Sequence, residues 1–362
     1  MNIHKYKKII KRSCMLFAVT GTFLLSACKN KNASIVLITN GMQTEDSASM
    51  NSAEEGVKKF AKNSNKTYTS VASKEQNTKG YEEAIDTALA AGAKVIICPG
   101  KEFETAVYNR QKDNLSVKFI LLNGLPHAAD SKKEKLRGNT HAVLFSEEQS
   151  GYLAGYSAVW EGNTNLGFMG GEKDDSTMYY GSGFVQGAND AAKEMGLKAD
   201  QIVVRYGFLG TTLASPQVEQ TAASWYDEGC QVIFGCDHSI LNAIAKAASA
   251  RGRRVITVDN ILNDFSANVL SCISYNYGSA IYKVLNHMEE KEYPGGEAQT
   301  VKVGSDGVYI DFDHSTFHTF TPEKYDELCK ELKSGSRKVK TVDVTKNLSK
   351  YKIENVTVNL EK

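Results

Sequence analysis

Six short turns rich in glycine and polar residues follow apolar segments of the chain, and a ligand could bind beside them. The turns are Asn40-Gly41, Pro99-Gly100, Asn123-Gly124, Gly170-Gly171, Gly235-Cys236 and Asp259-Asn260. If the apolar segments are parallel strands, ligands bind outside their carboxyl ends, next to such turns. Asp237 and His238 directly follow the fifth turn and could supply further polar contacts. The residue types therefore indicate non-covalent binding of a small polar molecule.

Motifs that would indicate catalysis are absent from the sequence. Neither Gly-x-Ser-x-Gly nor Gly-x-x-x-x-Gly-Lys occurs, and Gly181-Ser182-Gly183 lacks the strand–turn–helix context of a phosphate-binding loop. A Ser/His/Asp triad cannot be nominated from spacing, because its members come together only in the folded chain. We expect no enzymatic activity and no cofactor.

The seven cysteines show no metal-binding or disulfide pattern. No Cys-x-x-Cys or His-Glu-x-x-His spacing occurs. Beyond residue 28, the cysteines are mostly embedded in apolar runs, where a thiol behaves as a small hydrophobic group. They are Cys98, Cys230, Cys236, Cys272 and Cys329. We therefore expect neither a bound metal nor a disulfide scaffold.

The first 28 residues resemble the signal peptide of a bacterial lipoprotein. Five basic and no acidic residues precede an uncharged apolar stretch over residues 14–27, which is too short to span a bilayer comfortably. It ends in Leu25-Ser26-Ala27-Cys28, which resembles a lipobox. An ordinary signal peptide or an uncleaved anchor is the alternative. We expect a mature chain that begins at Cys28 and is held by lipid at the extracytoplasmic face of the cell membrane.

Charge excludes one class of partner. The chain has 43 basic and 42 acidic residues; without the leader's five basic residues, 38 face 42, a net charge of −4. Such a balance gives no basic surface for nucleic acid.

Separately from the charge, we expect the mature protein to be a monomer.

Strand-like and helix-like segments alternate from residue 34 onward. In the first half, the expected strands are residues 35–39, 67–71, 95–98 and 118–123, and the expected helices are 52–62, 79–91 and 104–111. Apolar strands between amphipathic helices predict an α/β fold, in which a parallel sheet is covered on both faces.

The same alternation starts again at about residue 142. The further strands expected are 142–145, 165–169, 201–206, 232–234, 254–258, 269–273, 300–303 and 308–312, with helices at 147–160, 180–195, 216–228, 240–251 and 278–290. This is too much chain for one doubly wound sheet, so we predict two lobes. The first lobe would comprise residues 34–145 and 272–298, and the second 146–271 and 299–333. Residues 334–362 form a tail that the pattern does not place.

Several stretches resemble one family in their order and spacing. They are Ser-Gly-Tyr-Leu-Ala-Gly-Tyr at 150–156, Gly-Phe-Met-Gly-Gly at 167–171, Gly-Phe-Val-Gln-Gly at 183–187, and segments 229–234, 255–259 and 304–308. The chain resembles the basic membrane protein family of lipoproteins, the substrate-binding components of nucleoside-type ABC importers. The resemblance implies a type I periplasmic-binding-protein fold, two doubly wound parallel-sheet lobes joined by a multi-strand hinge. It also implies a nucleoside ligand, with a purine favoured, and an ABC permease as partner.

The family holds a base between aromatic rings and the ribose with charged side chains, and some positions here match. Asp259 matches the ribose-binding aspartate, although a helix cap is the alternative. Tyr180 lies where the family has a stacking aromatic, with Tyr179 as the substitute if the register slips. Met50, followed by Asn51, stands where the family has a phenylalanine, and a thioether can also lie on a ring face.

Other positions match less well. Asp46 could face the same cleft, and Glu104 or Thr105 lies near the family's base-reading aspartate. Gly235 and Asp237 belong to a turn that differs from the family's glycine-rich one, and the family's lysine near residues 274–275 is missing. These departures leave open a binder for another small polar or sugar-like solute, or a surface sensor without transport.

Overall fold

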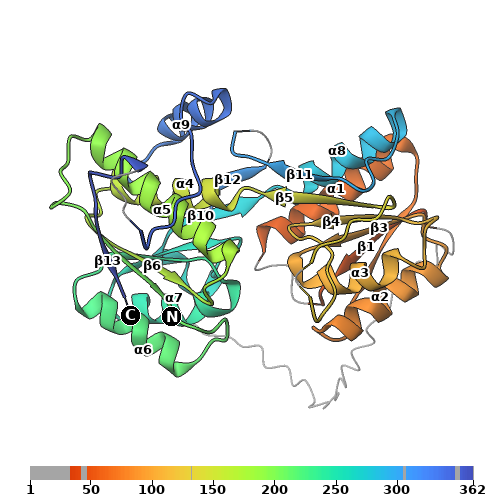
Figure 1. Ribbon diagram of the computed structural model, residues 1–362, viewed down its shortest axis with the longest axis horizontal. Helices are drawn as coiled ribbons and strands as arrows, with labels where there is room; N and C mark the ends of the chain where they lie inside the picture. Colours follow the sequence, from red (N-terminus) through yellow and green to blue (C-terminus); the bar gives the residue numbers. More distant parts are fainter. Residues whose placement is uncertain (1–32, 42–46, 132, 305–306, 347–350, 362) are drawn as a thin grey trace, which may run out of the picture. The chain divides into compact units, whose positions relative to one another are not determined.

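The computed structural model describes residues 33–361 except 42–46, 132, 305–306 and 347–350 (Figure 1). The expected lipidation site, Cys28, and the candidate Asp46 lie outside the described residues. Residues 31–362 form a single compact unit. No helix in the described part of the chain is long and apolar enough to cross a membrane.

Among the described residues, the first sheet has six strands, and all its neighbouring strands are parallel. From edge to edge these strands are β11 (Ala298–Val301), β5 (Thr140–Phe145), β4 (Lys118–Leu122), β3 (Val95–Pro99), β1 (Ile35–Thr39) and β2 (Tyr68–Ala72). The helices of this lobe are α1 (Ala48–Ser64), α2 (Thr78–Ala90), η2 (Lys101–Phe103), α3 (Glu104–Gln111) and α8 (Tyr277–Glu290). In β1, Val36 packs in a core with α2 and α3, whereas Leu37 packs in the core that contains α1 and α8. This alternation explains why the central strands β1 and β3 are buried on both faces and are mostly apolar.

The second sheet has seven strands in the part of the chain that the structure describes. In order they are β12 (Val308–Asp311), β10 (Val269–Tyr275), β9 (Arg254–Val258), β8 (Val232–Gly235), β6 (Asn165–Gly170), β7 (Val203–Phe208) and β13 (Thr357–Leu360). Only the β10–β12 pair is antiparallel among these described neighbours. The helices of this lobe are α4 (Glu147–Trp160), α5 (Asp175–Glu194), α6 (Pro216–Asp227), α7 (His238–Ser249), η3 (Asn263–Asn268) and α9 (Pro322–Ser334). The predicted α/β fold of two doubly wound lobes is confirmed.

Within the described residues, the chain passes between the two sheets three times: after β5, after β10, and between β11 and β12 (Figure 1). The second crossing comes after Tyr275 and not at residue 272 as expected, because β10 pairs with β9 and β12 throughout its length. Strand β11 belongs to the first sheet up to Val301, whereas residues from 299 onward were expected in the second lobe. The predicted lobe boundary is therefore shifted by four residues at the second crossing and by three residues at the third.

The tail that the pattern did not place forms part of the second lobe. Strand β13 pairs in parallel with β7, with Thr357 opposite Val203. Three of its four residues are exposed, so the strand carries no apolar signal in the sequence. The Arg337 guanidinium donates to Tyr152 and Glu194 and ties the tail to α4 and α5.

Glycines set the close packing of α4 against α5. A Cβ added at Gly151 would lie 1.9 Å from the carbonyl oxygen of Tyr180, and one at Gly155 would lie 2.0 Å from that of Phe184. Gly183 and Gly187 of α5 are equally tight against the backbone of α4. The repeated glycines at 151 and 155 therefore form a helix–helix contact, and this contact fixes the position of Tyr180 in the second turn of α5.

Candidate functional site

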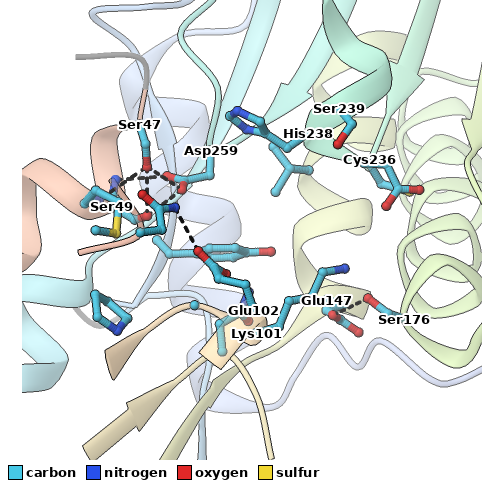
Figure 2. Close-up of a pocket in the computed structure, with 18 of the residues that line it drawn as sticks. Ser47, Ser49, Lys101, Glu102, Glu147, Ser176, Cys236, His238, Ser239 and Asp259 are labelled. Carbon is cyan, nitrogen blue, oxygen red and sulfur yellow. Dashed lines mark hydrogen bonds between the residues drawn. The ribbon is translucent and has the colours of Figure 1, made fainter. Parts of the chain in front are cut away.

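A cavity of about 480 Å³ lies where the carboxyl ends of strands from both sheets meet (Figure 2). The first lobe lines it with Asn40, Ser47, Ser49, Met50, Gln76, Tyr81, Pro99, Gly100, Lys101, Glu102, Asn123 and Tyr277. The second lobe lines it with Glu147, Ser176, Thr177, Tyr180, Thr212, Cys236, Asp237, His238, Ser239, Val258, Asp259 and Tyr275. The cavity is thus at the place where open α/β sheets bind ligands, and its size suits one small molecule.

Asp259 connects the two lobes at one end of the cavity. It directly follows β9, and its carboxylate accepts hydrogen bonds from Ser47 Oγ (2.9 Å), the Ser49 backbone N–H (2.9 Å) and Ser49 Oγ. Ser47 is also the N-cap of α1, where it accepts from the Met50 N–H. The carboxylate therefore lies on the amino terminus of α1, where the helix dipole and free N–H groups favour a negative charge. We refer to Asp259, Ser47 and Ser49 as the aspartate end of the cavity.

Burial dominates the titration of Asp259. It raises the pKa of this carboxyl to about 6, although the hydrogen bonds from Ser49 and Ser47 act in the opposite direction. The residue also has a left-handed backbone conformation, with φ of 52°, and its N–H donates to the Ile273 carbonyl at 2.7 Å. An aspartate tolerates this conformation better than most residues. The backbone thus aims the side chain across the cavity despite a cost in desolvation.

The opposite end of the cavity contains a lysine and two carboxylates. Lys101 comes from the turn after β3, and its side chain extends toward Glu147 and Ser176 (Figure 2). Ser176 Oγ donates to Glu147 at 2.5 Å, and the Gly171 N–H donates to Asp237 at 2.8 Å. We refer to Lys101, Glu147 and Asp237 as the lysine end.

Charges act on one another across the lysine end. Burial lowers the pKa of Lys101, but the negative charges of Asp237 and Glu147 outweigh it and raise this pKa. Burial raises the pKa of Glu147 to about 7, against the opposing effects of Ser176 and Lys101. Burial also raises the pKa of Asp237. Both carboxylates therefore lie in surroundings that disfavour their charge, and Lys101 is the cation that compensates for it.

Between the two ends, the walls combine amide groups and tyrosine rings. Asn40 donates to Glu102 at 2.8 Å, which places an amide and a carboxylate side by side. Tyr180 and Tyr275 join their hydroxyls in a hydrogen bond. The rings of Tyr275 and Tyr277 are nearly parallel, at 7°, with centroids 6.2 Å apart. This part of the cavity can surround a flat polar molecule with ring surface and hydrogen-bonding groups.

Several residues chosen from the sequence line the cavity. Asp259, Tyr180, Met50 and Asp237 are among them, and so is His238. Most of the Tyr180 ring is covered by protein, with 5% of its surface exposed, and its edge meets Phe234. The structure therefore brings these residues together from both lobes.

Other chosen residues lie elsewhere. Asn51 is exposed on α1, because a residue adjacent to Met50 points to a different side of the helix. Tyr179, Thr105 and Glu104 are not among the described residues that line the cavity; Glu104 instead accepts from the Leu125 N–H at 2.8 Å and contacts His127. Gly235 also lies outside the lining, and its missing side chain leaves room for Leu241 and Ile244.

Sequence reasoning missed most of the lysine end and part of the aspartate end. Among the missed residues are Ser47 and Ser49 at the aspartate end, Lys101 and Glu147 at the lysine end, and Glu102 in the wall between the two ends. Lys101 follows the turn at Pro99-Gly100, and Glu147 follows strand β5, so the strand-end rule would have found both. The short turn η2 places Lys101 and Glu102 at the strand end. They come three residues before Glu104 and Thr105, which the sequence analysis expected near the cleft.

The described residues contain no group of three His, Cys, Asp or Glu side chains that could hold a metal ion. His314 and His318 are four residues apart, but His314 contacts Asp311 and His318 contacts Glu161. The five cysteines of this part of the chain are unpaired.

Two parallel-sheet lobes with a cavity at their strand ends define a two-lobed solute-binding protein. The family model "ABC transporter substrate-binding protein PnrA-like" (Bmp) matches residues 33–347. The chain belongs to this family, as the sequence motifs indicated.

Similar proteins agree with this assignment. A nucleoside-binding protein of an ABC transporter, BmpA of Lactococcus lactis subsp. cremoris, is 23% identical over 342 residues, and the match covers 86% of this chain and 93% of BmpA. A solute-binding protein structure from Conexibacter woesei has a TM-score of 0.65 at 17% identity and covers 85% of this chain and 99% of its own. One from Aeropyrum pernix has a TM-score of 0.57 at 17% identity, with coverage of 83% and 85%. These two structures are similar in fold.

Proposed function

We propose that this protein captures a nucleoside, with a purine favoured, in the cavity between its lobes and delivers it to an ABC importer. The main observation behind this proposal is the buried carboxylate of Asp259, which faces tyrosine rings and amide groups across a cavity large enough for one small ligand. A nucleoside presents the matching chemistry: sugar hydroxyls that donate to a carboxylate, and a flat base with polar edges. The nucleoside-binding relative BmpA supports the same ligand class.

The aspartate end can hold the sugar. Among the described contacts, one oxygen of Asp259 accepts only the Ser49 N–H, whereas the other accepts both serine hydroxyls. A carboxylate offers about four acceptor positions, so this arrangement leaves capacity for a ligand hydroxyl. A hydrogen bond from the ligand to a charged oxygen is also stronger than one between neutral groups. We therefore assign the ribose to this end.

The tyrosine-lined middle of the cavity can hold the base. Stacking of a base on an aromatic ring contributes about 1–3 kcal/mol, and the larger ring system of a purine covers more ring surface. Met50 also lines the cavity and can add a sulfur–ring contact. Asn40 and Glu102 supply a donor and an acceptor for the polar edge of the base.

We also propose that the protein is anchored to the cell membrane by a lipid. A lipid on Cys28 would tether the two lobes at the cell surface beside the permease, as the lipobox-like sequence indicates. Incorporation of a radiolabelled fatty acid into the wild-type chain, lost in Cys28→Ala, would support lipid anchoring; equal labelling of both would contradict it.

One observation favours a second ligand class, a sugar-like or other small polar solute. The first lobe lines the cavity with Met50 where an aromatic ring would complete a sandwich, and polar groups surround the space. Sugars are bound largely through such polar groups.

Thermal unfolding of residues 31–362 with a panel of nucleosides, free bases and sugars tests the proposal. A ligand that binds only the folded state stabilises it by about 2.7 kcal/mol at a hundredfold excess over its Kd. We expect purine nucleosides to raise the Tm, and free ribose to do so weakly or not at all. A Tm raised by sugars alone would favour the second ligand class. Purine nucleosides without effect on a cooperatively unfolding protein would contradict the proposal.

A further inference from the structure

The charged groups around the cavity are strongly unbalanced. Among the described residues that line it, four are carboxylates and one is an ammonium group. The carboxylates are Glu102, Glu147, Asp237 and Asp259, and the ammonium belongs to Lys101. His238 adds a positive charge only when it is protonated. The position of this single lysine therefore matters for every solute that enters.

Lys101 reaches from one lobe toward the acids of the other. It follows β3 of the first sheet, whereas Glu147 begins α4 and Asp237 precedes α7 of the second lobe. Figure 2 shows its side chain directed toward Glu147 and away from Asp259. The charges of Asp237, Glu147 and Asp174 all act on this ammonium group. Lys101 thus occupies the place that a cationic group of a ligand would otherwise take.

We propose that Lys101 is a specificity-determining residue that sets the charge class of the solute. It is an internal counter-cation for Glu147 and Asp237, so the cavity accepts an uncharged solute and does not need a cationic one. This inference rests on the proposed function only for the identity of the uncharged solute, a nucleoside.

The physical argument concerns buried charge without a partner. Removing one member of a buried charged group leaves the other charges uncompensated, at a large cost. Without Lys101, the lysine end would favour a ligand that carries an ammonium group of its own. A phosphorylated solute, by contrast, meets an excess of carboxylates whether Lys101 is present or not. Rejection of wrong charges in this way is a common source of specificity.

Cys236 allows the charge of the cavity to be measured without any ligand. It lines the cavity and is partly exposed, whereas Cys98, Cys230, Cys272 and Cys329 are buried. Cationic and anionic methanethiosulfonate reagents react with the same thiolate, so the ratio of their rates cancels the thiolate fraction and reports the local potential. The experiment uses residues 31–362, and Cys236→Ser gives the background rate.

Substitutions of Lys101 and of Glu147 should change the cation-to-anion rate ratio at Cys236 in opposite directions. Lys101→Met should raise the cation-to-anion rate ratio, with each rate changing on the order of threefold or more for a unit charge several ångströms away. Glu147→Gln should lower the ratio. Lys112→Met, which removes an exposed lysine at the end of α3, is the matched control and should leave the ratio unchanged. An unchanged ratio in Lys101→Met would overturn the proposal.

Binding assays then test specificity itself. The wild type should bind a nucleoside more tightly than a derivative whose base carries an aminoalkyl or a carboxyalkyl group, because the base lies on the side of the lysine end. Lys101→Met should shift preference toward the aminoalkyl derivative by about tenfold or more. Equal weakening of all three ligands would mean that Lys101 is only a ligand contact, and would overturn the proposal. If the wild type binds no nucleoside, the proposed function fails, while the reagent rates still decide the role of Lys101.

Discussion

The two ends of the cavity join the same lobes by different physical means. At the aspartate end, Asp259 accepts hydrogen bonds with defined directions from Ser47 and Ser49 of the first lobe. At the lysine end, Lys101 and the acids Glu147 and Asp237 act on one another through their charges. Hydrogen bonds depend on orientation, whereas Coulomb interactions depend mainly on distance and surroundings. We infer that the aspartate end orients a ligand and that the lysine end selects it by charge.

The two ends also share a cost. Burial raises the pKa of Asp259 to about 6 and that of Glu147 to about 7, so both charges are held in unfavourable surroundings. Such a cost is typical of binding sites, where function requires groups that the fold alone would not favour. Neutralising Asp259 should therefore weaken ligand binding without lowering the stability of the ligand-free protein.

The largest expected effect is on ligand affinity at the aspartate end. Asp259→Asn keeps the shape of the side chain but removes the charge that accepts ligand hydroxyls. We expect the Kd for a nucleoside to rise roughly 10- to 100-fold, the equivalent of one charge-assisted hydrogen bond. Isothermal titration calorimetry at pH 7.5 measures the change.

The same variant distinguishes binding from folding. Because the buried charge is costly, ligand-free Asp259→Asn should be at least as stable as the wild type at pH 7.5. Asp264→Asn, an exposed aspartate in η3, is the matched control and should change neither quantity. A lower Tm together with unchanged affinity would show that Asp259 is only a cap for α1.

An intermediate effect is expected in the pH dependence of stability. A carboxyl whose pKa is higher in the folded than in the unfolded state contributes stability below its unfolded pKa, and this is lost as the pH rises through its folded pKa. For Asp259 the loss should run from about pH 4 to 6, and for Glu147 from about pH 4.5 to 7. Urea unfolding of the ligand-free protein between pH 4 and 8 measures both.

Variants assign each part of that loss to one end. Asp259→Asn should reduce the loss between about pH 4 and 6, and Glu147→Gln should reduce the loss between about pH 4.5 and 7 and abolish the part above about pH 6. If both variants retain the full wild-type pH dependence, the charges at the two ends are not costly and the comparison of the ends fails.

Most of the fold could be predicted from the sequence, because apolar strands and glycine-bounded helices are local signals. The errors lie where pairing is decided by distant strands. Strand β10 continues to Tyr275 because β9 and β12 flank it, and β13 is recognisable only through β7. No window of sequence around residues 357–360 contains that information.

Site residues could be predicted where they directly follow a strand. Asp259 and Asp237 follow strands, and both line the cavity. Glu104 was expected nearby, but the tight turn η2 uses up three residues and brings Lys101 to the strand end instead. The contacts of Asp259 with Ser47 and Ser49 span more than 200 residues of sequence, so only the folded chain reveals them.

The smallest expected effect, and the one that separates the two ends most directly, is the response to salt. The Debye length falls from about 30 Å at 10 mM to about 3 Å at 1 M salt, which weakens interactions through space far more than direct hydrogen bonds. We therefore expect the difference in Cys236 reagent-rate ratio between wild type and Lys101→Met to shrink several-fold over this range. The affinity ratio between wild type and Asp259→Asn, measured for an uncharged nucleoside, should change less than twofold. If both quantities decrease together with salt, the aspartate end also acts mainly through its charge, and orientation by hydrogen bonds does not distinguish it from the lysine end.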